Sequence, residues 1–297
     1  MTKREQREID LDLYHVYAGI LFANQDFSTG ENTRLQFDFT CKEYGELINK
    51  YSLQEIAGEG SEFTRALKLC RYLAPRLKHK GDYCGDVAQN ALTLLDYAFE
   101  KEEGINCVCK AKILQECCLA LGIYVRRVGM YPLSPYDVDN HVVCEIYDRQ
   151  LQKWIFLDPT TGGYFSDGDN PLGILEVREK VMRMQPVSVI LDRQNPKDLQ
   201  KLQTKNSADN SYYAKNLAFF SVDEISTFGA KGESLWLVPT GFCAEERFYA
   251  NMEYRMKTFR ELQAQSLAEK MEAQLKEMKK EKMKRISLAA FVAPPSV

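Results

Sequence analysis

Residues 104–126 read GINCVCKAKILQECCLALGIYVR, and this stretch decides the fold. It predicts one helix, because Asn106 is a favourable N-cap and Gly122 favours the left-handed turn that ends a helix. Four side chains fall within about 40° of Cys107 on such a helix: Ala111, Leu114, Cys118 and Leu121. Cys107 therefore begins the packing face in the first turn, where unpaired N–H groups and the helix dipole stabilise an anionic sulfur.

The cysteines also have other interpretations. Taken alone, Cys107 is more often a small buried hydrophobe than a nucleophile. A zinc site is disfavoured, because Cys109 lies about 200° around the helix from Cys107 and Cys118 lies about 16 Å along it. We expect Cys109, Cys117, Cys118 and Cys144 to be core residues. The count of nine is odd and includes an adjacent pair, which suits free thiols better than a disulfide framework.

Two strands are predicted downstream, over residues 141–147 and 152–158, with a polar four-residue loop between them. A loop of this length sets a register in which Tyr147 faces Gln152, and counting back places His141 directly opposite Asp158. Opposed Cβ atoms lie about 4.5–5.5 Å apart, so the carboxylate could hold one imidazole nitrogen and leave the other for a thiol. Cys107, His141 and Asp158 would then form the arrangement that a thiol nucleophile needs.

The histidine and the aspartate also have ordinary explanations. A histidine at a strand start is commonly a surface or core residue, and an aspartate before proline commonly starts a turn. His15 and His79 fall in predicted helical stretches without a matching cysteine and acid. Asp137 and Asp139, just before His141, either favour a cationic substrate and raise the pKa of the histidine, or are merely solvated.

Composition describes an ordinary globular protein. The 297 residues carry a formal net charge of −3 and a sequence pI near 5.8, which give no reason to expect nucleic acid or an anionic membrane as a partner. No apolar run approaches the ~20 residues that span a bilayer. We therefore predict a cytoplasmic protein without membrane association.

Helical periodicity dominates the first hundred residues. It predicts helices over 62–78 and 86–102, with a short strand over 34–40, and Pro75 could kink or split the first helix. A helix followed by paired strands, with a further strand over 187–191, predicts an α+β layer.

The last third of the chain contains a polar segment and a helical pattern. Residues 194–209 mark a boundary or a mobile loop. Helical periodicity then runs over about 244–286, and its second half, 269–285, holds seven Lys or Arg against four Glu. That half is either a solvated helix or a basic face that touches a partner or a membrane surface.

Three motifs resemble those of the transglutaminase-like superfamily in order and spacing. They are GINCVCKAKILQECCLALGIYVR at 104–126, HVVCEIYD at 141–148 and KWIFLDPT at 153–160. The resemblance covers roughly residues 60–190. It implies a papain-like α+β core in which Cys107 is the nucleophile, His141 the base and Asp158 its orienter.

The chain departs from that family in places. Val142 and Val143 follow the histidine, where many relatives carry a small residue and then an aromatic one. The acidic sites of calcium-dependent relatives are not found, since residues 167–170 lack the alternating ligand pattern and read as a turn. We expect no metal and no cofactor. The Cys107 N–H is one candidate oxyanion donor, and the continuation over 164–178 looks like a bacterial subgroup.

The predicted fold is α+β, with a papain-like, transglutaminase-like core whose nucleophile helix packs on an antiparallel sheet. The predicted division is a helical and strand N-terminal extension over 1–60, the transglutaminase-like domain over 61–242, a long C-terminal helix over 243–290 and a loose tail over 291–297.

The predicted function is a thiol-dependent peptidase, amidase or acyl transferase that acts on a peptide or protein substrate. Hydrolysis is favoured over crosslinking, because water is always present and no feature identifies a site for an acceptor amine. One alternative is a non-catalytic binding module that contacts a partner through the C-terminal helix. Glycan removal from glycopeptides, as in the related peptide N-glycanases, is a weaker alternative because paired C-x-x-C zinc motifs are absent.

Overall fold

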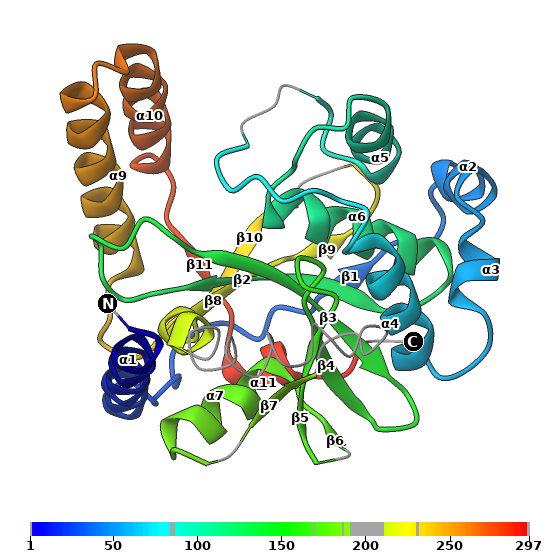
Figure 1. Ribbon diagram of the computed structural model, residues 1–297, viewed down its shortest axis with the longest axis horizontal. Helices are drawn as coiled ribbons and strands as arrows, with labels where there is room; N and C mark the ends of the chain where they lie inside the picture. The colour runs from blue at the N-terminus through cyan, green and yellow to red at the C-terminus, as the bar shows by residue number, and fades with distance from the viewer. Residues whose placement is uncertain are drawn as a thin grey trace.

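A six-stranded sheet forms the centre of the computed structural model (Figure 1). Its strands lie in the order β11 (Lys284–Arg285), β10 (Ser234–Leu237), β8 (Phe219–Asp223), β2 (Val125–Tyr131), β3 (His141–Asp148) and β4 (Lys153–Leu157). Neighbouring strands are antiparallel except β10 and β11, which are parallel. The structure describes residues 2–83, 87–168, 170–185, 187–190, 211–229 and 232–295. The predicted polar boundary at 194–209 and part of the predicted turn at 167–170 lie outside these ranges.

Helices cover one face of this sheet (Figure 1). They are α2 (Glu43–Lys50), α3 (Leu53–Ala57), α4 (Glu62–Leu73), α5 (Ala91–Glu100) and α6 (Cys107–Ala120). Helix α6 packs directly on β2 and β3, and α2, α4 and α5 pack around it. Every side chain of α6 from Cys109 to Leu119 is buried. The prediction of an α+β fold is therefore confirmed, and the helix that begins at Cys107 packs on the antiparallel part of the sheet.

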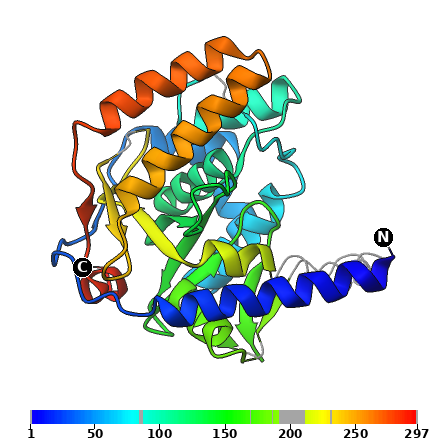
Figure 2. The same cartoon turned by 90° about the vertical axis from the view of Figure 1, so that its left-hand side faces the viewer.

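The opposite face of the sheet carries a second layer. It contains α1 (Lys3–Ala23), α7 (Ile174–Met182), a helical turn at 211–216 and a small sheet of β6 (Asn170–Pro171), β5 (Tyr164–Asp167) and β7 (Ser188–Ile190). Helix α1 packs on α7, and its N-terminal end projects from the body in Figure 2. In the described ranges, no helix combines the length and apolarity needed to cross a membrane.

Both predicted ends of α6 are present. The Asn106 side chain accepts a hydrogen bond from the Cys109 N–H at 3.1 Å, so it caps the helix as expected. At the other end, Gly122 has φ +72°, and the Ile123 N–H donates back to the Cys118 carbonyl at 3.0 Å. This is the six-to-one bond of a glycine-terminated helix, and it turns the chain into β2.

The β3–β4 hairpin forms as predicted, but its register was predicted wrongly. Tyr147 faces Trp154 rather than Gln152, and the last pair is Asp148 with Lys153. The Asp148 carboxylate accepts the N–H groups of the next turn residues at 2.9 and 3.0 Å, which keeps Asp148 in the strand and starts the turn after it. Gln152 has φ +53° and belongs to that turn.

Other predicted boundaries also shift. Helix α4 ends at Leu73 instead of continuing to residue 78, because Pro75 has no backbone N–H to donate to a further turn. Helix α5 begins at Ala91 rather than at residue 86, since the Asn90 side chain accepts the Thr93 N–H at 2.9 Å and starts the helix there. The strand predicted over 34–40 is reduced to β1 (Gln36–Phe37), which pairs in parallel with β9 (Ile225–Ser226).

The long C-terminal helix was predicted wrongly and is a hairpin of two helices. Helices α9 (Ala244–Glu261) and α10 (Gln265–Met278) pack on each other, and Gln263 has φ +59° in the turn between them. Four buried side chains join the two helices: Met252, Met256, Met271 and Leu275. A periodic apolar pattern continues through such a turn, so periodicity alone did not reveal the break.

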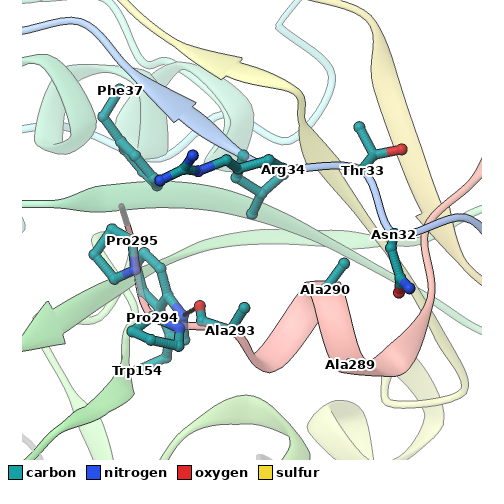
Figure 3. Close-up of a pocket in the computed structure, with 11 residues that line it drawn as sticks. Asn32, Thr33, Arg34, Phe37, Trp154, Ala289, Ala290, Ala293, Pro294 and Pro295 are labelled. Carbon is teal, nitrogen blue, oxygen red and sulfur yellow. Dashed lines mark hydrogen bonds between the residues drawn. The ribbon is translucent and has the colours of Figure 1, made fainter. Parts of the chain in front are cut away.

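The predicted loose tail is also wrong, because most of it is anchored. Helix α11 (Leu288–Val292) buries Phe291 completely. The indole Nε1 of Trp154 donates to the Ala293 carbonyl at 2.9 Å. A cavity of about 370 Å³ remains between this segment and residues 32–37. Figure 3 shows residues that line it, among them Arg34, Phe37, Trp154, Pro294 and Pro295.

A buried ion pair within the sheet also contacts α11 and the first residue of α7. The Arg126 guanidinium lies 2.6 Å from the Glu145 carboxylate, and both side chains are almost fully buried. Arg126 also donates to the Phe291 carbonyl at 2.5 Å and lies 4.2 Å from the ring centroids of Trp154 and Phe291. The other oxygen of Glu145 accepts the Ile174 N–H at 2.7 Å.

We expect Glu145→Ala to lower the free energy of unfolding by about 3–5 kcal/mol, because it leaves the buried Arg126 charge uncompensated. Urea titration would measure this loss. The matched control is Glu179→Ala, which removes an exposed ion pair with Arg183 on α7 and should cost less than about 1 kcal/mol. Equal losses in the two variants would contradict the role assigned to Glu145.

Candidate active site

Three side chains far apart in the sequence meet at the first turn of α6. The His141 Nε2 lies 2.9 Å from an Asp158 carboxylate oxygen, and both side chains are buried. The half-buried Cys107 sulfur lies close enough to the His141 ring to raise the pKa of the imidazole through a hydrogen bond and through its charge. Since Nε2 is taken by Asp158, the other nitrogen, Nδ1, remains for the sulfur. The structure thus brings together all three residues that the sequence singled out.

The route by which they meet differs from the predicted one. In the observed register His141 is two residues away from direct opposition to Asp158, and it pairs with Met130 of β2 instead. Because side chains alternate along a strand, a shift of two residues keeps both on the same face as diagonal neighbours. Diagonal neighbours are within reach of a long side chain, so the contact survives the error in register.

The charges of the pair are strongly coupled. Burial alone disfavours a charged imidazole, but the Asp158 carboxylate and the Cys107 sulfur outweigh it and raise the pKa of His141 to about 10. Burial also opposes ionisation of Asp158. The charge and hydrogen bond of His141 outweigh it, and Tyr213 and the Thr160 N–H donate further hydrogen bonds to the carboxylate. Together they lower the pKa of Asp158 to about 2. The carboxylate is therefore ionised and the imidazole readily takes a proton.

This raised pKa of His141 makes part of the stability depend on pH. Its pKa is about 10 in the folded protein against 6.5 for an ordinary histidine, so the contribution is fully present below pH 6.5 and is lost as the pH rises through about 10. We expect the difference in unfolding free energy between wild type and His141→Gln to be larger at about pH 6 than at about pH 10. Urea titrations at both pH values would measure it, and a constant difference would contradict the assignment.

Tyr213 is a member of the site that the sequence did not reveal. Its buried hydroxyl donates to the same Asp158 oxygen that holds His141. The neighbouring Tyr212 ring packs edge-on against the His141 ring, with centroids 5.6 Å apart. Both tyrosines begin the helical turn at 211–216, directly after a polar stretch, and no periodic pattern connects them to the hairpin.

We expect Tyr213→Phe to slow the alkylation of Cys107 by about 10-fold, because a hydrogen bond to a charged group contributes roughly 1.5–3 kcal/mol. The same change removes a hydrogen bond that lowers the pKa of Asp158. In a plot of the alkylation rate against pH, the acid limb should therefore move to higher pH. Tyr212→Phe is the matched control, since it keeps the ring contact with His141. Identical profiles for the two variants would contradict a positioning role for the Tyr213 hydroxyl.

The comparisons with known proteins bear on the same region. Residues 50–159 match the model of the transglutaminase-like superfamily, and this range contains α6, the β3–β4 hairpin and the three residues of the site. Residues 50–159 therefore belong to the transglutaminase-like superfamily. No curated protein matches it significantly in sequence.

One solved structure is similar to part of this chain. It is a candidate cysteine protease from Cytophaga hutchinsonii, with 14% sequence identity and a TM-score of 0.32. The similarity covers 56% of this chain and 50% of that one. The chain thus spans half the length of the protein that it matches.

The other thiols of the transglutaminase-like core are placed differently from Cys107. Cys109, Cys117, Cys118 and Cys144 are buried, as predicted, and the eight cysteines in the described ranges are all free. Burial raises the pKa of Cys109 to about 11. Within the described residues, no group of three or more His, Cys, Asp or Glu side chains is placed to hold a metal ion.

Lys110 is a second feature that the sequence did not single out. It lies one turn after Cys107, is buried, and donates from Nζ to the Leu77 carbonyl at 2.5 Å. Burial lowers the pKa of Lys110, while the charges of Asp158 and Cys107 act in the opposite direction. The lysine is therefore close enough to the three residues to offset negative charge there.

His79 was predicted in a helix, but it pairs in an isolated bridge with Ile105 instead.

The acidic loop before His141 has a cationic partner. Lys215 lies 2.9 Å from a carboxylate oxygen of Asp137 and 3.6 Å from Asp139. Its Nζ also lies 5.2 Å from the Tyr212 ring centroid. Asp137 is thus already paired, which leaves its predicted role in attracting a cationic substrate without support.

Proposed function

We propose that this chain is a cysteine hydrolase or acyl transferase that acts on amide bonds of peptides or proteins through Cys107, His141 and Asp158. One observation carries the proposal: a buried imidazole is held on one nitrogen by an ionised carboxylate and has the thiol at a helix N-terminus as its other partner. A nucleophile, a base and an orienter in hydrogen-bonding sequence are what covalent acyl transfer requires.

The reaction follows from this order. His141 takes the proton of the Cys107 thiol, and the sulfur attacks the carbonyl carbon of an amide. When the carbon–nitrogen bond breaks, the imidazolium returns that proton to the leaving amine, and a thioester with Cys107 remains. Water, deprotonated by His141, then attacks the thioester and releases the carboxylic acid and the free thiol. An amine in place of water would give a new amide.

The first turn of α6 is suited to stabilise the developing oxyanion. The first intrahelical bond of α6 runs from the Lys110 N–H to the Asn106 carbonyl at 3.1 Å, and the Cys109 N–H is bound by the Asn106 side chain. The N–H groups of Cys107 and Val108 come earlier in the helix and take part in neither of these two bonds. They are therefore the two candidate donors toward a carbonyl oxygen beside the sulfur.

Hydrolysis is the favoured outcome over crosslinking. Water is present at high concentration, and no feature of the sequence identifies a site for an acceptor amine. Water is therefore the usual acceptor of the acyl group.

Capture of the acyl-enzyme tests the proposal. The protein would be incubated with p-nitrophenyl acetate and digested, and the peptide that contains Cys107 would be examined by mass spectrometry. We expect one acetyl group on that sulfur, removable by neutral hydroxylamine as a thioester is. Added methylamine would report how the acyl group divides between water and amine. A wild-type protein that forms no thioester would favour the non-catalytic binding module instead.

A further inference from the structure

A pocket of about 170 Å³ opens beside the first turn of α6. Val108, next to Cys107 in sequence, lines one side of the pocket, and Asn140 and Val142, on either side of His141, line another. Beyond them the pocket runs over β2, β8 and β10, on the face of the sheet that α6 covers. It therefore lies where a residue next to the reacting amide of a bound chain would pass.

The missing side chain of Gly129 leaves room in this pocket for the hydroxyl groups of Ser221 and Tyr131. A Cβ atom at Gly129 would lie 2.5 Å from the Ser221 hydroxyl and 2.6 Å from the Tyr131 hydroxyl, which is too close for any side chain. The Tyr131 ring can therefore fold back over the strand, and its hydroxyl shares a 3.2 Å hydrogen bond with Ser221. The floor of the pocket is polar but uncharged.

An ion pair between Arg127 and Asp223 lines the same pocket. Two guanidinium nitrogens, Nε and Nη2, donate to a single carboxylate oxygen, Oδ2, at 3.1 and 2.6 Å. Within the described residues, no protein group bonds the Nη1 of Arg127 or the Oδ1 of Asp223. The side chains keep 12% and 11% of their surfaces exposed, so a ligand can reach them. The pair thus offers one donor and one acceptor without net charge.

The size and charge of the pocket limit what can enter. Its 170 Å³ is more than ten times the roughly 10–15 Å³ that one water needs and less than the roughly 300 Å³ of small-molecule sites, which suits one side chain. A cationic side chain would meet Arg127 and an anionic one would meet Asp223. Either would lose hydration without a net attraction. A carboxamide instead presents one carbonyl acceptor and one NH₂ donor to the two partners.

We propose that this pocket is a substrate subsite that selects asparagine or glutamine beside the amide that reacts, with Arg127 and Asp223 as the residues that recognise the carboxamide. The inference rests on the proposed function, since it takes Cys107 as the nucleophile.

The test uses peptidyl acyloxymethyl ketones, which alkylate a nucleophilic thiol and carry a peptide of chosen sequence. A series would place glutamine, glutamate, lysine or methionine at each of the positions before the ketone. We expect glutamine to label Cys107 at least ~10-fold faster than methionine at one of these positions, because methionine leaves the polar groups of the pocket unpaired. A series without any preference for a carboxamide would overturn the proposal.

A pair of double variants assigns the preference to this pocket. Arg127→Met/Asp223→Leu removes both charges together, so no single buried charge is left, and the ratio of the glutamine rate to the methionine rate should fall toward one. Arg183→Met/Glu179→Leu, which removes an exposed pair on α7, should keep the wild-type ratio. A ratio that stays high in the first variant would overturn the assignment to Arg127 and Asp223.

Failure of this inference can be separated from failure of the proposed function. If Cys107 reacts with iodoacetamide in a manner that depends on His141 but no probe position prefers a carboxamide, the subsite is wrong and the nucleophile stands. If neither the probes nor iodoacetamide react at Cys107 in a His141-dependent manner, both proposals fail.

Discussion

Replacing Cys107 by alanine is expected to abolish thioester formation in the α6 segment when the protein is treated with p-nitrophenyl acetate. The thiol is the atom that forms the thioester, so no other group of the site can replace it in bond formation. Mass spectrometry of the digested protein would show the hydroxylamine-sensitive acetyl group in wild type and its absence in the variant. Each peptide must be resolved, because Cys243 is also exposed.

Cys109→Ala is the matched control for this experiment. Cys109 lies two residues further along the same helix, but its side chain is buried, its sulfur donates toward the Gln89 side chain, and burial raises its pKa to about 11. We expect the control to keep its acylation at Cys107. A thioester that still forms within the α6 segment of Cys107→Ala would contradict the assigned nucleophile.

Asp158→Asn is expected to slow turnover of p-nitrophenyl acetate by roughly 10³–10⁴-fold, the scale seen when the acid of a catalytic triad becomes an amide. An ionised carboxylate accepts a hydrogen bond from the Nε2–H of His141 and so leaves Nδ1 facing the sulfur. An asparagine can present an N–H there instead, which favours the other tautomer. The rate of p-nitrophenol release measures the effect.

A second buried aspartate provides the control. Asp148 lies at the other end of β3 and accepts backbone N–H groups of Phe63, Gln150 and Leu151. Asp148→Asn should lower the stability, because it weakens these bonds, while the folded protein keeps its turnover rate. If the two variants lose activity in proportion to their losses of stability, Asp158 has only a structural role.

The parts of this site that could be predicted depend on local signals. The caps at Asn106 and Gly122 fix both ends of α6 within a few residues, and such caps act through adjacent backbone groups. The hairpin was also foreseen, but its register depends on how the Asp148 carboxylate binds the turn, which loop length alone does not specify. The contact between His141 and Asp158 was predicted from a wrong register. The prediction still held, because a register error of two residues leaves both side chains on the same face of the sheet.

The remaining parts depend on contacts between distant segments. Tyr213 reaches Asp158 from 55 residues away, across a polar stretch that reads as a boundary. Arg127 and Asp223, 96 residues apart, meet only because β8 pairs with β2. The anchoring of Phe291 under Arg126 likewise depends on the complete sheet. Patterns of period 2 or 3.6 describe one element at a time and contain no information about such pairs.

The most direct test of the central claim is the rate at which iodoacetamide alkylates Cys107 in wild type and in His141→Gln at about pH 7. The account predicts a fall of roughly 100-fold or more, because the imidazole is the group that accepts the thiol proton and a positioned base contributes about 10²–10⁴-fold. Equal rates in the two proteins, with both folded, would contradict it and would leave Cys107 as an ordinary thiol at the end of a helix.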